Sequence, residues 1–177
     1  MEIKAELRKP YTEKQRLDFI VEQNHTRGYV IEETSSALLA WGDTDEELLA
    51  KKKENKFNEN TAKAKEAVEE GYVEFKDAEF ETNAQTVGDL TATMLLMQAS
   101  GLETYDWLSK DDKVVTLTLE DFGTLGGLIA AFKNVVWSIK YLYFKSLIEA
   151  ATTPSEVDDI VIDYNIEIEQ GEEDVIS

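Results

Sequence analysis

Apolar residues recur every three or four positions along four stretches of the chain, and this spacing predicts four helices. The first covers residues 12–28, the second residues 43–71 and the third residues 85–101. The fourth and longest follows Thr118 and runs for about 30 residues, or roughly 45 Å at the helical rise. The pairs Thr12 with Gln15, Thr44 with Glu47 and Thr118 with Asp121 have the spacing of helix-capping residues, and each stands at one of these starts.

Strict alternation of apolar and polar residues predicts short strands elsewhere. It occurs at residues 3–7, at residues 29–31 before an irregular loop, in a hairpin at residues 72–82 that turns at residues 76–78, and at residues 113–119. Since an isolated hairpin is marginal in water, we expect the hairpin and strand 113–119 to share one sheet. The longest alternation, at residues 160–169, predicts a strand that pairs with the N-terminal strand or with a neighbouring molecule.

These elements predict an α+β fold that is mainly helical, in which one long C-terminal helix packs with one or two other helices and a small antiparallel sheet. Changes in pattern divide the chain into an N-terminal strand and helix module at 1–42, a helical domain with a small β-sheet at 43–153, and an acidic C-terminal strand and tail at 154–177. Gly126 and Gly127 in the long helix predict either a close approach of another backbone or a kink.

The charge of the chain narrows the classes of partner. Eighteen basic and 37 acidic residues give a formal net charge of −19, and no Lys or Arg follows Lys145. Nucleic-acid binding depends on cations that displace counterions, and anionic membranes repel such a surface, so we expect no contact with either. The acidity serves solubility or, as an alternative, mimicry of DNA.

Residue types that carry chemistry are scarce. The chain has no cysteine and one histidine, His25, which suits the end of a helix better than a catalytic group without an identified partner. Acidic clusters at 158–163 and 172–174 lack the order of a calcium-binding loop, and the glycines at 123–127 lack the lysine of a phosphate loop. We therefore expect no catalytic residue, no bound metal, no cofactor and no enzymatic activity.

The long helix and the last strand offer apolar residues for contacts with other polypeptides, and we expect the chain to form an oligomer through one of them. Lys133, Asn134 and Lys140 interrupt the helix too often for a membrane span. The N-terminus lacks the apolar segment of a signal peptide, so we expect a cytosolic protein. The predicted interaction residues are Phe122, Leu125, Ile129, Phe132, Val136, Trp137, Ile139, Tyr143, Ile162, Tyr164, Ile166 and Ile168.

Two parts of the chain resemble proteins encoded by tailed phages and prophages. Residues 51–160 resemble a family of unknown function, through an Ala/Lys/Glu-rich helix, "GYVEFKDAEFETNAQTVGDL", "KVVTLTLEDF" and "LIEAATTPSEVDDI". Residues 9–42, "KPYTEKQRLDFIVEQNHTRGYVIEETSSALLAWG", are similar to a leader on small proteins of Firmicute and Fusobacterium prophages encoded near tail genes. The family defines no catalytic residue, and the segment after Asp159 lies outside its usual domain.

The resemblance implies a non-enzymatic, tail-associated structural or tail-assembly accessory protein that contacts other tail or baseplate proteins, in the virion or the host cytoplasm. An acidic, DNA-mimicking inhibitor of a host nucleic-acid-binding protein is the alternative.

Overall fold

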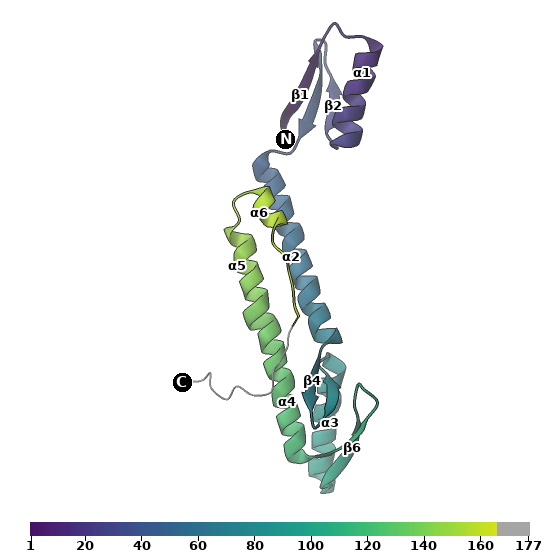
Figure 1. The fold of residues 1–177 in the computed structure, drawn as a ribbon, viewed down its shortest axis with the longest axis vertical. Helices are drawn as coiled ribbons and strands as arrows, with labels where there is room; N and C mark the ends of the chain where they lie inside the picture. The colour runs from purple at the N-terminus through teal and green to yellow at the C-terminus, as the bar shows by residue number, and fades with distance from the viewer. Residues whose placement is uncertain (166–177) are drawn as a thin grey trace. The chain divides into compact units, whose positions relative to one another are not determined.

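The computed structural model describes residues 1–165 of the 177, and their contacts divide the chain into two units (Figure 1). Unit 1 comprises residues 1–55 and 151–159, and unit 2 comprises residues 56–150 and the chain from residue 160 on. This division follows packing, whereas the predicted segments 1–42, 43–153 and 154–177 follow changes in sequence pattern. The two divisions differ, and the segment boundaries stay a prediction.

Unit 1 is built on a three-stranded antiparallel sheet with the order β1-β3-β2. The strands are β1 (Glu2–Arg8), β2 (Val30–Glu33) and β3 (Ala37–Gly42). Ala37, Leu38 and Ala40 of β3 are buried. The loop expected after residue 31 was wrong, because β3 is a central strand with apolar residues on both faces and so lacks the alternation that marks a half-buried strand.

The helices of unit 1 begin at side-chain caps. In α1 (Glu13–Ile20), Thr12 and Gln15 form the predicted capping box, and a π-helical segment, η1 (Val21–Thr26), continues the helix. The helix α2 (Asp45–Glu70) starts in unit 1, where Thr44 and Glu47 exchange the predicted hydrogen bonds. The short α6 (Pro154–Asp158) is capped by Thr153 and buries Val157.

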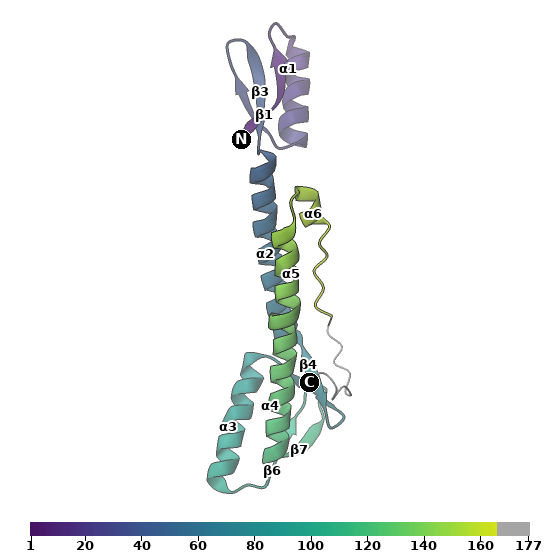
Figure 2. The same ribbon diagram turned by 90° about the vertical axis from the view of Figure 1, so that its left-hand side faces the viewer.

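Unit 2 contains the rest of α2 and the connected apolar core. Its further elements are β4 (Tyr72–Phe75), β5 (Ala78–Glu81), α3 (Ala84–Ser100), β6 (Thr104–Leu108), β7 (Val114–Thr118), α4 (Leu119–Asn134), η2 (Val135–Tyr141) and α5 (Leu142–Ala150). The last three form one continuous helix of 32 residues, capped at Thr118 as predicted. Figure 2 shows α3 beside α4, and the two helices contact each other. The predicted α+β class, mainly helical with a long helix and small antiparallel sheets, is confirmed.

The grouping of the strands differs from the prediction. Strand β7 pairs with β6, and the hairpin β4–β5 forms a separate two-stranded sheet. The sequence of β6, "TYDWL", carries a charge in its middle and gave no strand signal. Trp107 and Tyr105 of β6 lie edge-on to Phe122, at ring distances of 5.6 and 6.4 Å, so the second hairpin packs directly on the start of the long helix.

The turn of the first hairpin is Lys76–Asp77, and Ala78 already belongs to β5. Both turn residues have positive φ, 50° and 61°, which is the geometry that matches the twist of a two-residue hairpin but strains residues other than glycine. Lys76 forms an ion pair of 2.6 Å with Asp121, and Lys113 donates to the carbonyl oxygen of Asp77. These two lysines hold the strained turn against the rest of unit 2.

The buried row of the long helix changes phase at η2. Phe122, Leu125, Ile129, Phe132 and Val136 are buried at spacings of three and four, as the apolar pattern predicts. A π-helical turn adds one residue to this periodicity. The predicted continuation through Ile139 and Tyr143 therefore points to solvent, and Phe144 and Ile148 are buried instead.

Gly126 and Gly127 face open space. A Cβ atom added at either position would meet no atom within 4 Å among the described residues, so the expected close approach of another backbone is wrong. Close packing occurs at Gly71, where a Cβ would lie 2.6 Å from the ring of Phe132. The absence of a side chain at Gly71 lets the start of β4 approach α4.

The C-terminal strand expected at residues 160–169 is wrong for residues 160–165, which form no strand, while Ile166 and Ile168 lie outside the described residues. The segment 160–165, called the strap below, is held by lysine side chains of helices. Lys63 donates to the carbonyl oxygen of Ile162 at 2.8 Å, and Lys56 and Lys140 donate to those of Ile160 and Asn165. The predicted alternation does appear in burial, since Ile162 is buried and both its neighbours are exposed.

Candidate interaction surfaces

A groove of about 580 Å³ lies within unit 2. Its walls are the C-terminal turns of α2, the start of β4 and the strap, with Phe132 of α4 at the base. Val73, Phe132 and Ile162 are each at most 5% exposed, so the floor is apolar. The complete lining is Lys63, Glu66, Ala67, Glu70, Gly71, Tyr72, Val73, Glu74, Phe132, Ile162, Asp163, Tyr164 and Asn165.

Carboxylates dominate the rim of this groove. The lining contains four acidic residues, Glu66, Glu70, Glu74 and Asp163, and one basic residue, Lys63. The Lys63 ammonium is already engaged by the Ile162 carbonyl and lies 3.4 Å from Glu59. Within residues 1–165, no ion pair joins a cation to Glu66 or Glu70, so the groove offers unneutralised negative charge above an apolar floor.

The strap wall of the groove is fixed by a buried polar contact. The Tyr164 hydroxyl donates to Asn60 Oδ1 at 2.6 Å, and Asn60 Nδ2 donates to the carbonyl oxygen of Tyr141 at 3.2 Å. Asn60 is fully buried, so these two bonds satisfy an amide that would otherwise be costly to bury. Burial raises the pKa of Tyr164 to about 12, so the hydroxyl stays a donor even in alkaline solution where an exposed tyrosine ionises.

A second surface is the outward side of the helix beyond the phase change. Ile139 and Tyr143 are both 57% exposed, Leu142 is 52% exposed and Leu147 37%. Large apolar side chains gathered on one stretch of helix mark a surface suited to contact with another molecule. We call these four residues the helix patch.

By length and composition, the helix Leu119–Ala150 could cross a membrane, and only 28% of its most apolar window is buried within the described part of the protein. A core helix of a protein without a membrane segment passes the same test, so location in the cytoplasm or virion stays a prediction.

The predicted interaction residues fall into three groups. Phe122, Leu125, Ile129 and Val136 are core residues that no partner can reach in this fold, while Phe132 and Ile162 are buried but line the floor of the groove. Ile139 and Tyr143 are exposed in the helix patch, while Trp137, which packs on Tyr141, and Tyr164 are partly buried. Ile166 and Ile168 lie outside the described residues.

The sequence analysis missed the groove. Its signal was present in Glu66 and Glu70, which are one helical turn apart on the exposed surface of α2, next to Ala67. What could not be read from the sequence is the chain reversal that brings the strap and β4 to the same place.

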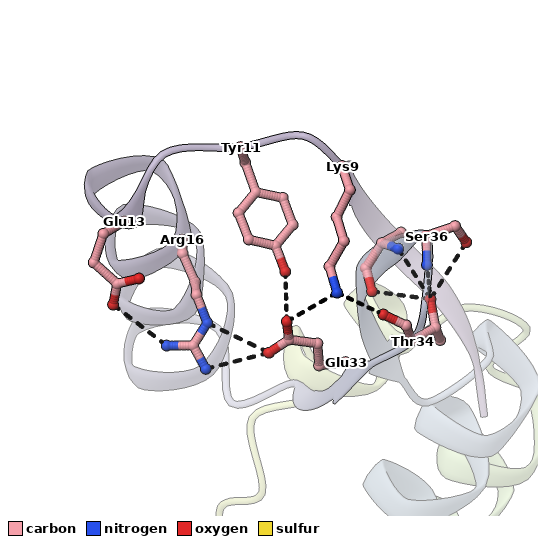
Figure 3. Close-up of polar contacts among 8 residues, drawn as sticks. Lys9, Tyr11, Glu13, Arg16, Glu33, Thr34 and Ser36 are labelled. Carbon is pink, nitrogen blue, oxygen red and sulfur yellow. Dashed lines mark hydrogen bonds and ion pairs between the residues drawn. The ribbon is translucent and has the colours of Figure 1, made fainter.

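The densest polar cluster of unit 1 surrounds Glu33 (Figure 3). The Glu33 carboxylate accepts from the Tyr11 hydroxyl at 2.8 Å, and lies 3.2 Å from the Lys9 ammonium and 3.3 Å from the Arg16 guanidinium. The Tyr11 hydrogen bond, followed by those from Lys9 and Arg16, lowers the pKa of Glu33. The cluster ties α1 and the segment before it to the end of β2, and it leaves no group poised to react.

The other candidates for chemistry do not converge. His25 is exposed in η1, and Asp158 pairs with Lys52. Among residues 1–165, no group of three or more His, Asp or Glu side chains is arranged to hold a metal ion, and the cluster at 172–174 lies outside that range.

Comparison with known proteins gives no further guide: no family model, no curated protein and no solved structure matches this chain.

Proposed function

We propose that this chain is a non-enzymatic binding protein that works through contacts with other proteins, as a tail-associated or tail-assembly accessory of a phage or prophage. The helix patch carries the proposal, because it exposes four large apolar side chains on a chain whose composition is otherwise strongly charged. The phage setting rests on the resemblance of residues 9–42 and 51–160 to prophage proteins.

The phase change in the helix supports a role for the patch. A π-helical turn replaces regular hydrogen bonds by a less common arrangement, and such turns occur often at functional positions. Here the turn takes Ile139 and Tyr143 out of the core, at the cost of leaving their apolar surface in water. A surface of this kind gains free energy when a partner covers it.

The test is co-expression of the tagged chain with the tail and baseplate proteins encoded next to it. We expect one of them to co-purify and to stay bound in about 0.5 M salt, because an apolar contact is little screened. The double variant Ile139→Asp/Leu142→Asp should lose this partner. The matched variant Leu95→Asp/Leu96→Asp, which puts the same charges on exposed positions of α3, should keep it.

Two further measurements on the purified chain, light scattering and partition into detergent or lipid vesicles, test the other possible occupants of the helix patch. A dimer abolished by Ile139→Asp/Leu142→Asp would make a second copy the partner, and partition into detergent or lipid vesicles would make it a membrane surface. Failure of every tail protein to bind would contradict the proposed setting.

A DNA-mimicking inhibitor is the second candidate, favoured by the net charge of −19. This function predicts capture of a basic nucleic-acid-binding protein that is released between about 0.1 and 0.5 M salt, where screening of exposed charges becomes strong.

A further inference from the structure

The groove of unit 2 shares no residue with the helix patch. It has an apolar floor and an acidic rim, and each of these would bind a different part of one ligand. Its floor, formed by Val73, Phe132 and Ile162, excludes water from an apolar side chain. Its rim, with Glu66 and Glu70 on α2 and Asp163 on the strap, attracts a cation.

We propose that this groove binds a basic segment of a partner protein, with an apolar side chain on the floor and flanking Lys or Arg side chains at the rim. The inference deepens the proposed function and rests on it, since it names the class of partner segment that the chain recognises. A volume of about 580 Å³ is within the range of sites that take a ligand of a few residues.

The charge count favours a cationic occupant over an acidic or neutral one. Four carboxylates and one ammonium line the groove, so the lining carries a formal charge of −3 from one minus four. The ammonium belongs to Lys63, which the strap and Glu59 already engage. The carboxylates of the groove would repel an acidic segment. This repulsion lowers the affinity for acidic partners and so contributes to specificity.

The chain itself shows how a cation is held at this edge. The Lys110 ammonium lies 4.9 Å from the centre of the Tyr72 ring and donates to the Glu70 carbonyl oxygen at 2.9 Å. Tyr72 lines the groove and is 44% exposed, so an aromatic ring that already holds one cation lies beside the acidic residues of the rim. Lys110 does not line the groove and leaves the carboxylates of Glu66 and Glu70 without an ion pair in the described chain.

Fluorescence polarisation with three labelled hexapeptides tests the proposal on the full chain. The peptides alternate isoleucine and phenylalanine with lysine, glutamine or glutamate, so they differ only in charge. We expect the lysine peptide to bind at least about tenfold more tightly than the glutamine peptide, and its affinity to fall with salt as expected for charge attraction.

The general attraction of a basic peptide to a chain of charge −19 must be separated from binding in the groove. Glu66→Gln/Glu70→Gln and Glu69→Gln/Glu103→Gln each remove two negative charges from exposed positions of unit 2, but only the first pair lines the groove. We expect the first variant to weaken binding of the lysine peptide about tenfold and the second less than about twofold. Equal losses would overturn the proposal.

Charge reversal gives a second, independent result. Glu66→Lys/Glu70→Lys should lose the lysine peptide and gain the glutamate peptide, and circular dichroism should show an unchanged fold because both positions are on the surface. If the wild-type chain binds the glutamate peptide as well as the lysine peptide, the groove does not select a cationic segment, and the proposal fails. If the wild-type chain does not bind the lysine peptide but does form a complex with a tail protein, this inference is wrong and the proposed function is unaffected.

Discussion

The first helix of unit 1 and the long helix of unit 2 are held in place by different physical means. No residue of α1 is fully buried, Phe19 and Ile20 are only partly buried, and the hydrogen bonds and ion pairs around Glu33 link the helix to the sheet. The helix α4 buries Phe122, Leu125, Ile129 and Phe132 in a core shared with both hairpins and α3. Exposed ion pairs contribute little to stability and depend on pH and salt, whereas buried apolar area contributes much and depends on neither. Unit 1 should therefore loosen under conditions that leave unit 2 folded.

The largest effect should follow removal of the central aromatic ring in unit 2. Phe122→Ala should lower the free energy of unfolding by about 3–5 kcal/mol, because it deletes a fully buried ring that two other aromatic rings contact. Leu17→Ala in α1, where the side chain is 51% exposed, should cost less than about 1 kcal/mol. Urea unfolding followed by circular dichroism measures both, and similar costs would remove the contrast between the two helices.

An intermediate effect should follow loss of the cap at Thr118. The Thr118 hydroxyl accepts from the Asp121 amide, and the Asp121 carboxylate accepts from the Thr118 amide at 2.7 Å. Thr118→Ala should cost about 1 kcal/mol, while Thr124→Ala, on the exposed side of the same helix, should cost a few tenths.

The same cap gives a pH dependence with a definite sign. The Lys76 ion pair, followed by the hydrogen bond from the Thr118 amide, lowers the pKa of Asp121 from 3.8 to about 2. A carboxyl group with a lowered pKa stabilises the fold above its unfolded value, so this contribution is complete above about pH 4 and is lost as the pH falls towards 2. Asp121→Asn should flatten that part of the stability profile, and an unchanged profile would count against the assignment.

The smallest effect should be local and confined to unit 1. Glu33→Gln should speed hydrogen exchange of the α1 amides roughly threefold without changing the exchange of α4, because it removes the charge that three side chains share. Since the pKa of Glu33 is lowered, acidification through that pKa should have the same consequence in the wild-type chain. Glu6→Gln is the matched control: its ion pair to Arg8 joins two residues of β1 and fastens no second element.

The contrast between the helices also explains what could be predicted from the sequence. Local rules sufficed for the caps at Thr12, Thr44 and Thr118, for the first hairpin and for the buried row up to Val136, because each depends on residues close in the chain. They failed for β6, whose sequence has a charge in its middle and whose aromatic residues pack on Phe122, and for the loop expected in place of β3. The strap shows both outcomes: alternation marked which residues are buried, but the partners of its backbone are lysines from distant helices.

The groove was hidden for the same reason. Glu66 and Glu70 were visible as neighbours on one helical face, but the sequence does not tell which other elements come to that face. His25 and the acidic residues near 158 were considered for chemistry on the basis of residue type alone, but His25 is exposed in η1 and Asp158 forms an ion pair with Lys52.

The π-helical turn at η2 keeps the two ends of the long helix in phase, although the sequence between them is one residue longer than regular winding allows. Deleting one residue between 135 and 141 would let this stretch wind regularly and would leave Phe144 and Ile148 on the buried side. Regular winding of the present sequence would instead rotate every side chain after the turn by about 100°, so that Ile139 and Tyr143 would face the core. One inserted codon, absorbed by such a turn, is thus a route by which related chains could place new side chains on the outer surface without disturbing the buried row.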